Sequence, residues 1–158
     1  MTALTVRQPW ASLIMRCGKD IENRDWRTNF RGPVAIHTSA KLSRSEIEDA
    51  CSMMRGFIPN FSERIFTAEV MKSPERYPTG CIVGTVEIVD CVTSSESPWF
   101  CGDFGFVLRN PVVFENPIPC RGALLFWDVP ESLLPGMREE WRKASVRTVI
   151  DDETERGA

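Results

Sequence analysis

The sequence predicts a single domain of mixed α/β (α+β) class, in which a small, mixed, barrel-like β-sheet carries short helices at its flank. The chain has 158 residues, of which 42% are apolar and 26% charged, so it is long enough to bury a core and is typical of a globular protein. Several apolar segments with strand character follow one another without regular helices between them, which favours such a sheet. The sequence shows no internal repeat and no second domain.

The first part of the chain is predicted to alternate strands and helices. A strand, a helix, a strand and a helix are expected, in that order, at 3–6, 8–18, 32–39 and 43–55. The first helix has apolar residues at helical spacing and Gly18 at its end. The second helix begins with Ser43 and Glu46 at the spacing of a capping box. Residues 57–79 contain three prolines, and we expect them to form an irregular insertion.

The second part is predicted to contain further strands followed by a helical end. The strands are expected at 81–92, 104–111 and 123–129, separated by a loop at 93–103 and by the turn-rich residues 115–122. One or two short helices should cover 130–143. The domain is therefore expected to span residues 1–143, with the insertion at about 57–79, and residues 144–158 to form a flexible tail.

Composition argues against several classes of site. The six cysteines form no CxxC pair and His37 is the single histidine, whereas a zinc site needs about four nitrogen or sulfur ligands, usually in close pairs. We therefore predict no metal and no cofactor, reduced cysteines that are mostly buried, and a structural His37. No apolar run reaches the roughly 18 residues of a membrane span and no secretion signal is visible, so we expect a cytoplasmic protein.

Charge is distributed unevenly along the chain. The formal net charge is -3, which argues against binding along a long phosphate backbone. The first 44 residues nevertheless hold eight lysines and arginines against three acidic residues. This local excess favours a compact anionic or electron-rich ligand.

The segment "CGKDIENRDW", residues 17–26, concentrates this charge beside a tryptophan. It is interpreted either as a solvated chain reversal or as the wall of a polar pocket. On the first interpretation, Lys19 and Glu22 form an exposed salt bridge that contributes less than about 1 kcal/mol. On the second, the same two side chains carry the chemistry. On both interpretations, substitutions at either residue are expected to leave the chain folded, since a pair in a turn contributes little stability.

Motifs along the chain resemble a known family. They are "RQPW" at 7–10, G-x-K-x-x-E-x-R at 18–24, and "RGP" followed by "IH" between 31 and 37. Later segments agree, namely "GTVEIVD", "FGFVL" and "NPIPCRGALLFWDVPESLLPG". Together they resemble the ASCH family of the PUA-like superfamily, and the last segment resembles its endothelial-overexpressed lipopolysaccharide-associated factor branch. The similarity covers nearly the whole chain apart from 57–79 and the tail.

The resemblance implies a small PUA-like mixed β-barrel with helices alongside and a polar cleft at one side. It therefore favours the pocket interpretation of residues 17–26. For function it implies three alternatives. Some relatives hydrolyse the amide of N4-acetylcytidine, others bind RNA or DNA, and a few are ribonucleases. Fold alone does not choose among them.

Lys19 and Glu22 are the candidate catalytic residues. Amide hydrolysis needs an activated nucleophile and a group that stabilises the developing oxyanion. Lys19 can supply that positive charge or act as a base, and Glu22 can position or deprotonate a water. The bacterial N4-acetylcytidine amidohydrolases carry threonine where Glu22 stands, which favours direct attack by water here. They also use a second acid, which by position falls near Glu96 or Asp103, and we select Asp103.

The candidate substrate-binding residues are polar, basic or aromatic side chains near this segment or on a later loop: Gln8, Trp10, Arg24, Trp26, Ser39, Lys41 and Trp99. Several have a structural alternative. Trp26 either stacks on a base or packs in the core, and Trp99 is either a lid or a surface aromatic. Gln8 either reads a base edge or caps the first helix, and Lys41 either lines the cleft or is solvated.

The leading prediction is therefore metal-independent hydrolysis of an N4-acylated cytidine or a similar nucleoside. The alternatives are a non-catalytic RNA-binding module and a ribonuclease. The expected partner is a modified nucleoside or a short RNA, with no membrane involved, and the chain is expected to act as a monomer.

Overall fold

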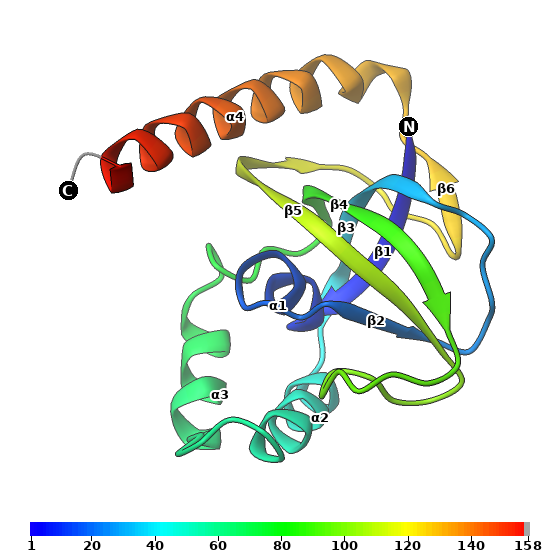
Figure 1. Cartoon of the computed structure of the whole chain (residues 1–158), viewed down its shortest axis with the longest axis vertical. Coiled ribbons are helices and arrows are strands. Elements are labelled where there is room, and N and C mark those ends of the chain that lie inside the picture. The colour runs from blue at the N-terminus through cyan, green and yellow to red at the C-terminus, as the bar shows by residue number, and fades with distance from the viewer. Residues whose placement is uncertain (157–158) are drawn as a thin grey trace.

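The structure is a computed structural model that describes residues 1–156, and it confirms the predicted α+β class. The elements are, in chain order, β1 (Thr2–Gln8), α1 (Trp10–Arg16), β2 (Ile21–Arg24), β3 (Gly32–Leu42), α2 (Arg44–Arg55), α3 (Glu63–Lys72), β4 (Cys81–Val92), β5 (Phe104–Pro119), β6 (Phe126–Asp128), the 3₁₀ turn η1 (Glu131–Leu133) and α4 (Leu134–Arg156). One end of the sheet carries α4, and α2 and α3 lie at the opposite end (Figure 1).

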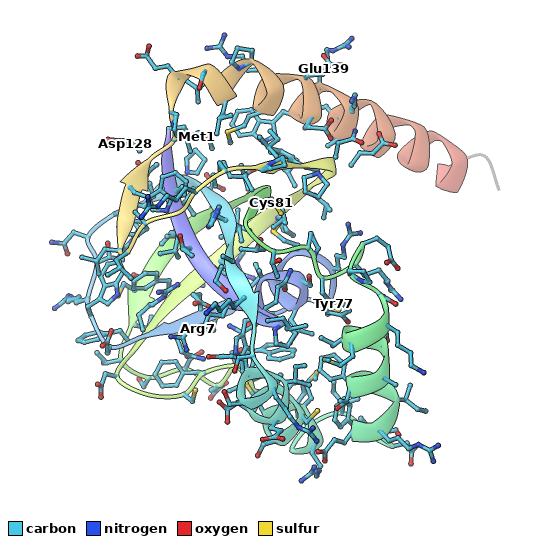
Figure 2. The ribbon with its side chains drawn as sticks, turned by 180° about the vertical axis from the view of Figure 1, so that it is seen from behind. Met1, Arg7, Tyr77, Cys81, Asp128 and Glu139 are labelled. Carbon is cyan, nitrogen blue, oxygen red and sulfur yellow. The ribbon has the colours of Figure 1, made fainter. Side chains whose placement is uncertain are left out.

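The six strands form one mixed sheet in the order β2-β5-β4-β3-β1-β6. Only β1 and β3 run parallel, in a register that places Ala3 opposite Ala35, and the other neighbours are antiparallel. The edge strands are therefore β2, which comes second in the chain, and β6, which comes last. Since β6 pairs with the start of β1, Met1 and Asp128 lie at the same end of the molecule (Figure 2).

The sheet curls like a barrel but does not close through its backbone. Its two edge strands, β2 and β6, are bridged by side chains instead. The ring of Trp26, which follows β2, packs edge-on against Phe106 at 4.9 Å and against Phe126 of β6 at 5.2 Å between ring centroids. Arg24 Nη2 also donates to the carbonyl of Thr5 on β1 at 2.7 Å. We call Arg24, Trp26 and Phe126 the seam of the barrel.

Helix α1 packs into the curled sheet. Its Ile14 and Met15 join the buried cluster that contains Val86 and Phe106. A glycine on β4 allows this close approach: a Cβ on Gly84 would overlap Met15 Cε and the carbonyl oxygen of Val112. Gly84 also has a φ of +156°, which other residues adopt only with strain.

The insertion predicted at 57–79 is not irregular throughout, because it contains helix α3. The Ser62 side chain caps this helix by accepting from the Ile65 amide. Val70 packs in a buried cluster with Ile47 and Cys51 of α2. The prolines that suggested a loop lie outside the helix, so they limit its length without preventing it.

The C-terminal end is also more regular than predicted. One or two short helices were expected at 130–143, whereas the single helix α4 continues beyond this range to Arg156. Its first turns are held to the sheet, since Trp141 Nε1 donates to Thr85 Oγ1 at 2.9 Å. Residues 144–156 contain no proline or glycine that would end a helix once it is anchored. Residues 157–158 of the predicted tail lie outside the described residues.

Two strand boundaries differ from the prediction. The turn-rich residues 115–119 continue β5, and β6 is restricted to Phe126–Asp128. The charged segment contains the short strand β2, which pairs antiparallel with β5 from Ile21 opposite Val107 to Arg24 opposite Phe104. In these segments, pairing with a long neighbouring strand outweighs the local sequence preference for a turn or a loop. Among the described helices, none is both long and apolar enough to cross a membrane.

Candidate functional site

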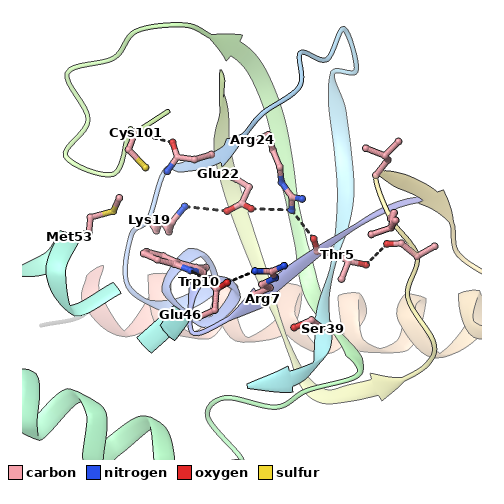
Figure 3. A pocket seen from close by; sticks show the side chains of 14 residues that line it. Thr5, Arg7, Trp10, Lys19, Glu22, Arg24, Ser39, Glu46, Met53 and Cys101 are labelled. Carbon is pink, nitrogen blue, oxygen red and sulfur yellow. Dashed lines mark hydrogen bonds and ion pairs between the residues drawn. The ribbon is translucent and has the colours of Figure 1, made fainter. Parts of the chain in front are cut away.

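The predicted polar cleft exists as a cavity of about 480 Å³ between β1, α1, β2, α2 and the loop before β6 (Figure 3). We call it the polar cavity. It is lined by Thr5, Arg7, Trp10, Lys19, Glu22, Asn23, Arg24, Ser39, Glu46, Met53, Cys101, Ala123, Leu124 and Leu125. Its volume falls in the range of about 300–1,000 Å³ that is usual for small-molecule sites.

Lys19 reaches this cavity through the tight connection between α1 and β2. Gly18 has a φ of +71°, a conformation that suits glycine, and directs the chain out of the helix. The Lys19 side chain is 2% exposed, and its ammonium donates to the Ile21 carbonyl and to Glu22 Oε2, the latter at 3.3 Å. It also lies 5.6 Å from the centroid of the Trp10 ring. The ammonium is thus buried and held by three neighbours.

Glu22 projects from β2 between two cations. One oxygen faces Lys19, and the other lies 3.0 Å from Arg24 Nη2. The Glu22 side chain is only 10% exposed. This burial corrects the expectation that the pair lies in a turn and adds little stability, because removing one partner leaves a buried charge. In the described structure Arg24 Nε is buried and has no hydrogen-bond partner.

A second carboxylate, which the sequence interpretation assigned to helix capping, enters the cavity from α2. Glu46 Oε1 lies 2.5 Å from Arg7 Nη1, and Glu46 Oε2 accepts from Trp10 Nε1 at 2.6 Å. The hydrogen bond and charge of Glu46 raise the pKa of the Arg7 guanidinium. Ser43 makes no side-chain capping bond, so the predicted capping box does not form. Glu46 instead orients the Trp10 indole on the cavity wall.

These residues give the polar cavity an excess of one positive charge. Lys19, Arg7 and Arg24 carry three positive charges, and Glu22 and Glu46 carry two negative charges. The balance suits a single anionic group or an electron-rich carbonyl and does not suit a polyanion.

The cavity contains some of the predicted substrate-binding residues and excludes others. Trp10, Arg24 and Ser39 line it. Gln8 does not, because it is fully buried with its amide accepting from the Ser12 backbone and donating to the Pro78 carbonyl. Gln8 therefore caps α1. Lys41 is exposed and lies outside the cavity.

Two of the predicted tryptophans are packing residues. Trp26 belongs to the seam and does not line the polar cavity. Trp99 is buried against Phe57, with 4.7 Å between the ring centroids, so it is neither a lid nor a surface aromatic. The Trp99 carbonyl accepts from Asn23 Nδ2 and so helps to fix the cavity wall.

Both candidates for the second acid lie away from the polar cavity. Glu96 and Asp103 are both exposed and neither lines the polar cavity, because the loop that carries them turns Trp99 inward. Besides Glu22, the acidic residue that lines the cavity is Glu46. Arg7 was missed as well, although the "RQPW" motif contains it, because nothing in the motif alone shows that its side chain meets Glu46.

His37 is a structural histidine, as predicted. Its ring nitrogens lie 3.2 Å from Thr5 Oγ1 and 3.0 Å from the Cys120 carbonyl, and burial lowers its pKa. In the part of the chain that the structure describes, no three His, Cys, Asp or Glu side chains are grouped so that they could hold a metal ion.

Comparison with known proteins agrees with this architecture. The sequence model of the ASCH domain matches residues 4–151. The chain is similar to human (Homo sapiens) Activating signal cointegrator 1, with 29% identity over 153 residues. It is also similar to the mouse (Mus musculus) protein of that name, with 27% identity over 148 residues. Each alignment covers 86% of this chain and 23% of the relative, so the chain spans less than a quarter of these relatives' length. The chain belongs to the ASCH domain family.

Proposed function

We propose that the polar cavity binds an N4-acylated cytidine, such as N4-acetylcytidine, and hydrolyses its amide. The observation that carries this proposal is the buried Lys19–Glu22 pair on the wall of a cavity of nucleoside size. The distance of 3.3 Å between their charged atoms is longer than the roughly 2.7–2.9 Å of a strong charge-assisted hydrogen bond. A substrate oxygen can therefore compete for the ammonium.

The reaction consumes one water molecule and involves no oxidation or reduction. Water attacks the acyl carbonyl carbon while Glu22 accepts a proton from it, and the negative charge that develops on the carbonyl oxygen is stabilised by the Lys19 ammonium. The carbon–N4 bond then breaks, and the proton on Glu22 passes to N4. The products are a carboxylic acid and cytidine.

The remaining wall offers groups that suit a pyrimidine. Arg24 has a buried Nε donor without a partner, and the carbonyl oxygen of a cytosine ring is an acceptor that would satisfy it. The Trp10 indole, oriented by Glu46, offers an aromatic surface. The ligand on this proposal is a modified nucleoside, either free or within a short RNA, and the chain acts as a monomer.

The second candidate function is recognition of the same ligand without hydrolysis. It is favoured by the pairing of both carboxylates: Glu22 lies between two cations, and Glu46 accepts from Arg7 and Trp10. Both carboxylates are thus engaged by protein donors, which leaves neither of them free to hold an attacking water. Arg7, whose side chain is 71% exposed at the rim, could then contact a neighbouring phosphate of an RNA.

The test is incubation of the purified protein with N4-acetylcytidine, following loss of the acylated chromophore and measuring nucleoside affinity on the same samples. We expect turnover that Lys19→Met and Glu22→Gln each lower by about a hundredfold or more. The matched controls Lys41→Met and Glu96→Gln change residues outside the cavity and should match the unmodified chain.

The outcomes separate the candidates. Affinity without turnover would establish the recognition function and refute hydrolysis. If the protein neither binds nor hydrolyses the nucleoside, and binds RNA with an affinity that falls steeply as the salt concentration rises, the proposal of a nucleoside cavity is refuted.

A further inference from the structure

A second cavity, of about 330 Å³, lies between α1, α2, α3 and the loop before β5. It shares no lining residue with the polar cavity. We call it the aromatic cavity, because its apolar wall includes Leu13, Met54, Phe61, Phe66, Tyr77 and Trp99. Its volume is sufficient for a small organic ligand.

The aromatic rings in this wall are arranged around one another without filling the space between them. The ring centroid of Phe66 lies 5.8 Å from that of Phe61 and 6.5 Å from that of Tyr77. The planes of the Phe66 and Tyr77 rings are nearly perpendicular. Edge-on and offset contacts of this kind are the ones that a further aromatic ring makes favourably. The wall therefore selects a flat apolar group.

One polar group in this wall, the Tyr77 hydroxyl, is not used by the described part of the protein. Tyr77 is 8% exposed as a residue and lines the cavity, and its hydroxyl makes no hydrogen bond with the side chains and backbone that the structure describes. Burial raises the pKa of Tyr77, and the nearby Glu69 charge raises it further, so the hydroxyl keeps its proton and is a donor. An oxygen acceptor on a ligand in the cavity can therefore take this hydrogen bond in place of water.

The charges at the mouth indicate the nature of that acceptor. Glu69 Oε1 lies 2.5 Å from Arg76 Nη1, and this ion pair neutralises the Glu69 carboxylate. Arg16 also lines the cavity, and it forms no ion pair with any residue that the structure describes. Two guanidinium groups therefore face one carboxylate, which leaves one positive charge for a ligand to neutralise.

From these observations we propose that the aromatic cavity is a binding site for a small aromatic carboxylate. Its ring system packs against Phe66 and Trp99, and its carboxylate accepts from the Tyr77 hydroxyl and pairs with Arg16. This site is independent of the polar cavity and of any reaction there.

The test uses three probes of similar size and different charge: 2-naphthoate, 2-naphthamide and 2-naphthylmethylamine. Calorimetric titration of the full chain should give the tightest binding for naphthoate and the weakest for the amine. Tyr77→Phe keeps the ring and removes the hydroxyl, so naphthoate affinity should fall about fivefold. Arg16→Gln should weaken naphthoate by a similar factor and leave naphthamide nearly unchanged. The control Arg64→Gln removes an exposed arginine of α3 outside the cavity and should have no effect.

Thiol alkylation gives a second readout that locates the ligand. Cys17 and Cys101 are both exposed; Cys17 lines the aromatic cavity and Cys101 lines the polar cavity. Naphthoate should slow alkylation of Cys17 and leave Cys101 unchanged, as measured by mass spectrometry of the peptides. The proposal is overturned if naphthoate does not bind at millimolar concentration, binds no better than the amide, or binds equally well to both variants. Protection of Cys101 in place of Cys17 would also overturn it.

Discussion

Replacing Lys19 by methionine should destabilise the fold by about 2–3 kcal/mol. Methionine keeps much of the length of the side chain and removes the ammonium, so the Ile21 carbonyl loses a donor and Glu22 loses one of its two cations. Breaking a fully buried ion pair costs about 3–5 kcal/mol. Here the loss should be smaller, because Glu22 keeps Arg24 at 3.0 Å and is itself 10% exposed.

The measurement is urea denaturation followed by a double-mutant cycle. Lys19→Met and Glu22→Gln should each destabilise, and the double variant should lose about 1–2 kcal/mol less than their sum, because the two residues share one interaction. Lys41→Met, an exposed lysine outside the cavity, is the matched control and should stay within about 0.5 kcal/mol of the unmodified chain. If Lys19→Met costs less than about 1 kcal/mol, the pair behaves like an exposed salt bridge and the reasoning from burial is refuted.

Three further predictions concern the sheet and its supports. Gly84→Ala should cost about 3 kcal/mol or more in denaturant unfolding, because its Cβ would overlap the rigid Val112 carbonyl. Burial alone would raise the pKa of Glu140, but hydrogen bonds from Lys143 and from an asparagine of β5 lower it to about 2. The free energy of unfolding should therefore fall by about 1–2 kcal/mol as the pH drops from about 4.5 towards 2, and Glu140→Gln should abolish that slope. Burial lowers the pKa of His37, so stability should also decrease as the pH falls below about 6.5, and an NMR titration of the ring should give a midpoint below that value.

The fold class could be predicted from sequence because strand periodicity and helix stop signals are local. Strand β2 could not, since its residues Ile21–Arg24 have the composition of a loop and become a strand only through pairing with β5. Helix α3 was missed because prolines on both sides suggested a loop. In each case the deciding interaction is with a segment far along the chain.

The candidate site was predictable to the extent that it is contiguous. Lys19, Glu22 and Arg24 come from one segment and meet in the structure as expected. Glu46 arrives from α2, and its spacing from Ser43 suggested a helix cap. The roles of Gln8 and Trp99 depend on partners at Pro78 and Phe57 that no local pattern identifies.

At the seam the barrel is completed by side-chain contacts and not by strand pairing. In the sheet as described, no ladder pairing joins β2 to β6, and the two edges are bridged by the side chains of Arg24, Trp26 and Phe126. Ladder hydrogen bonds form and break cooperatively along a strand, whereas rings and one guanidinium rearrange by side-chain rotation. Arg24 is at once a bridge of this seam and a wall of the polar cavity. One side chain therefore links the wall of the polar cavity to the side-chain contacts that complete the barrel.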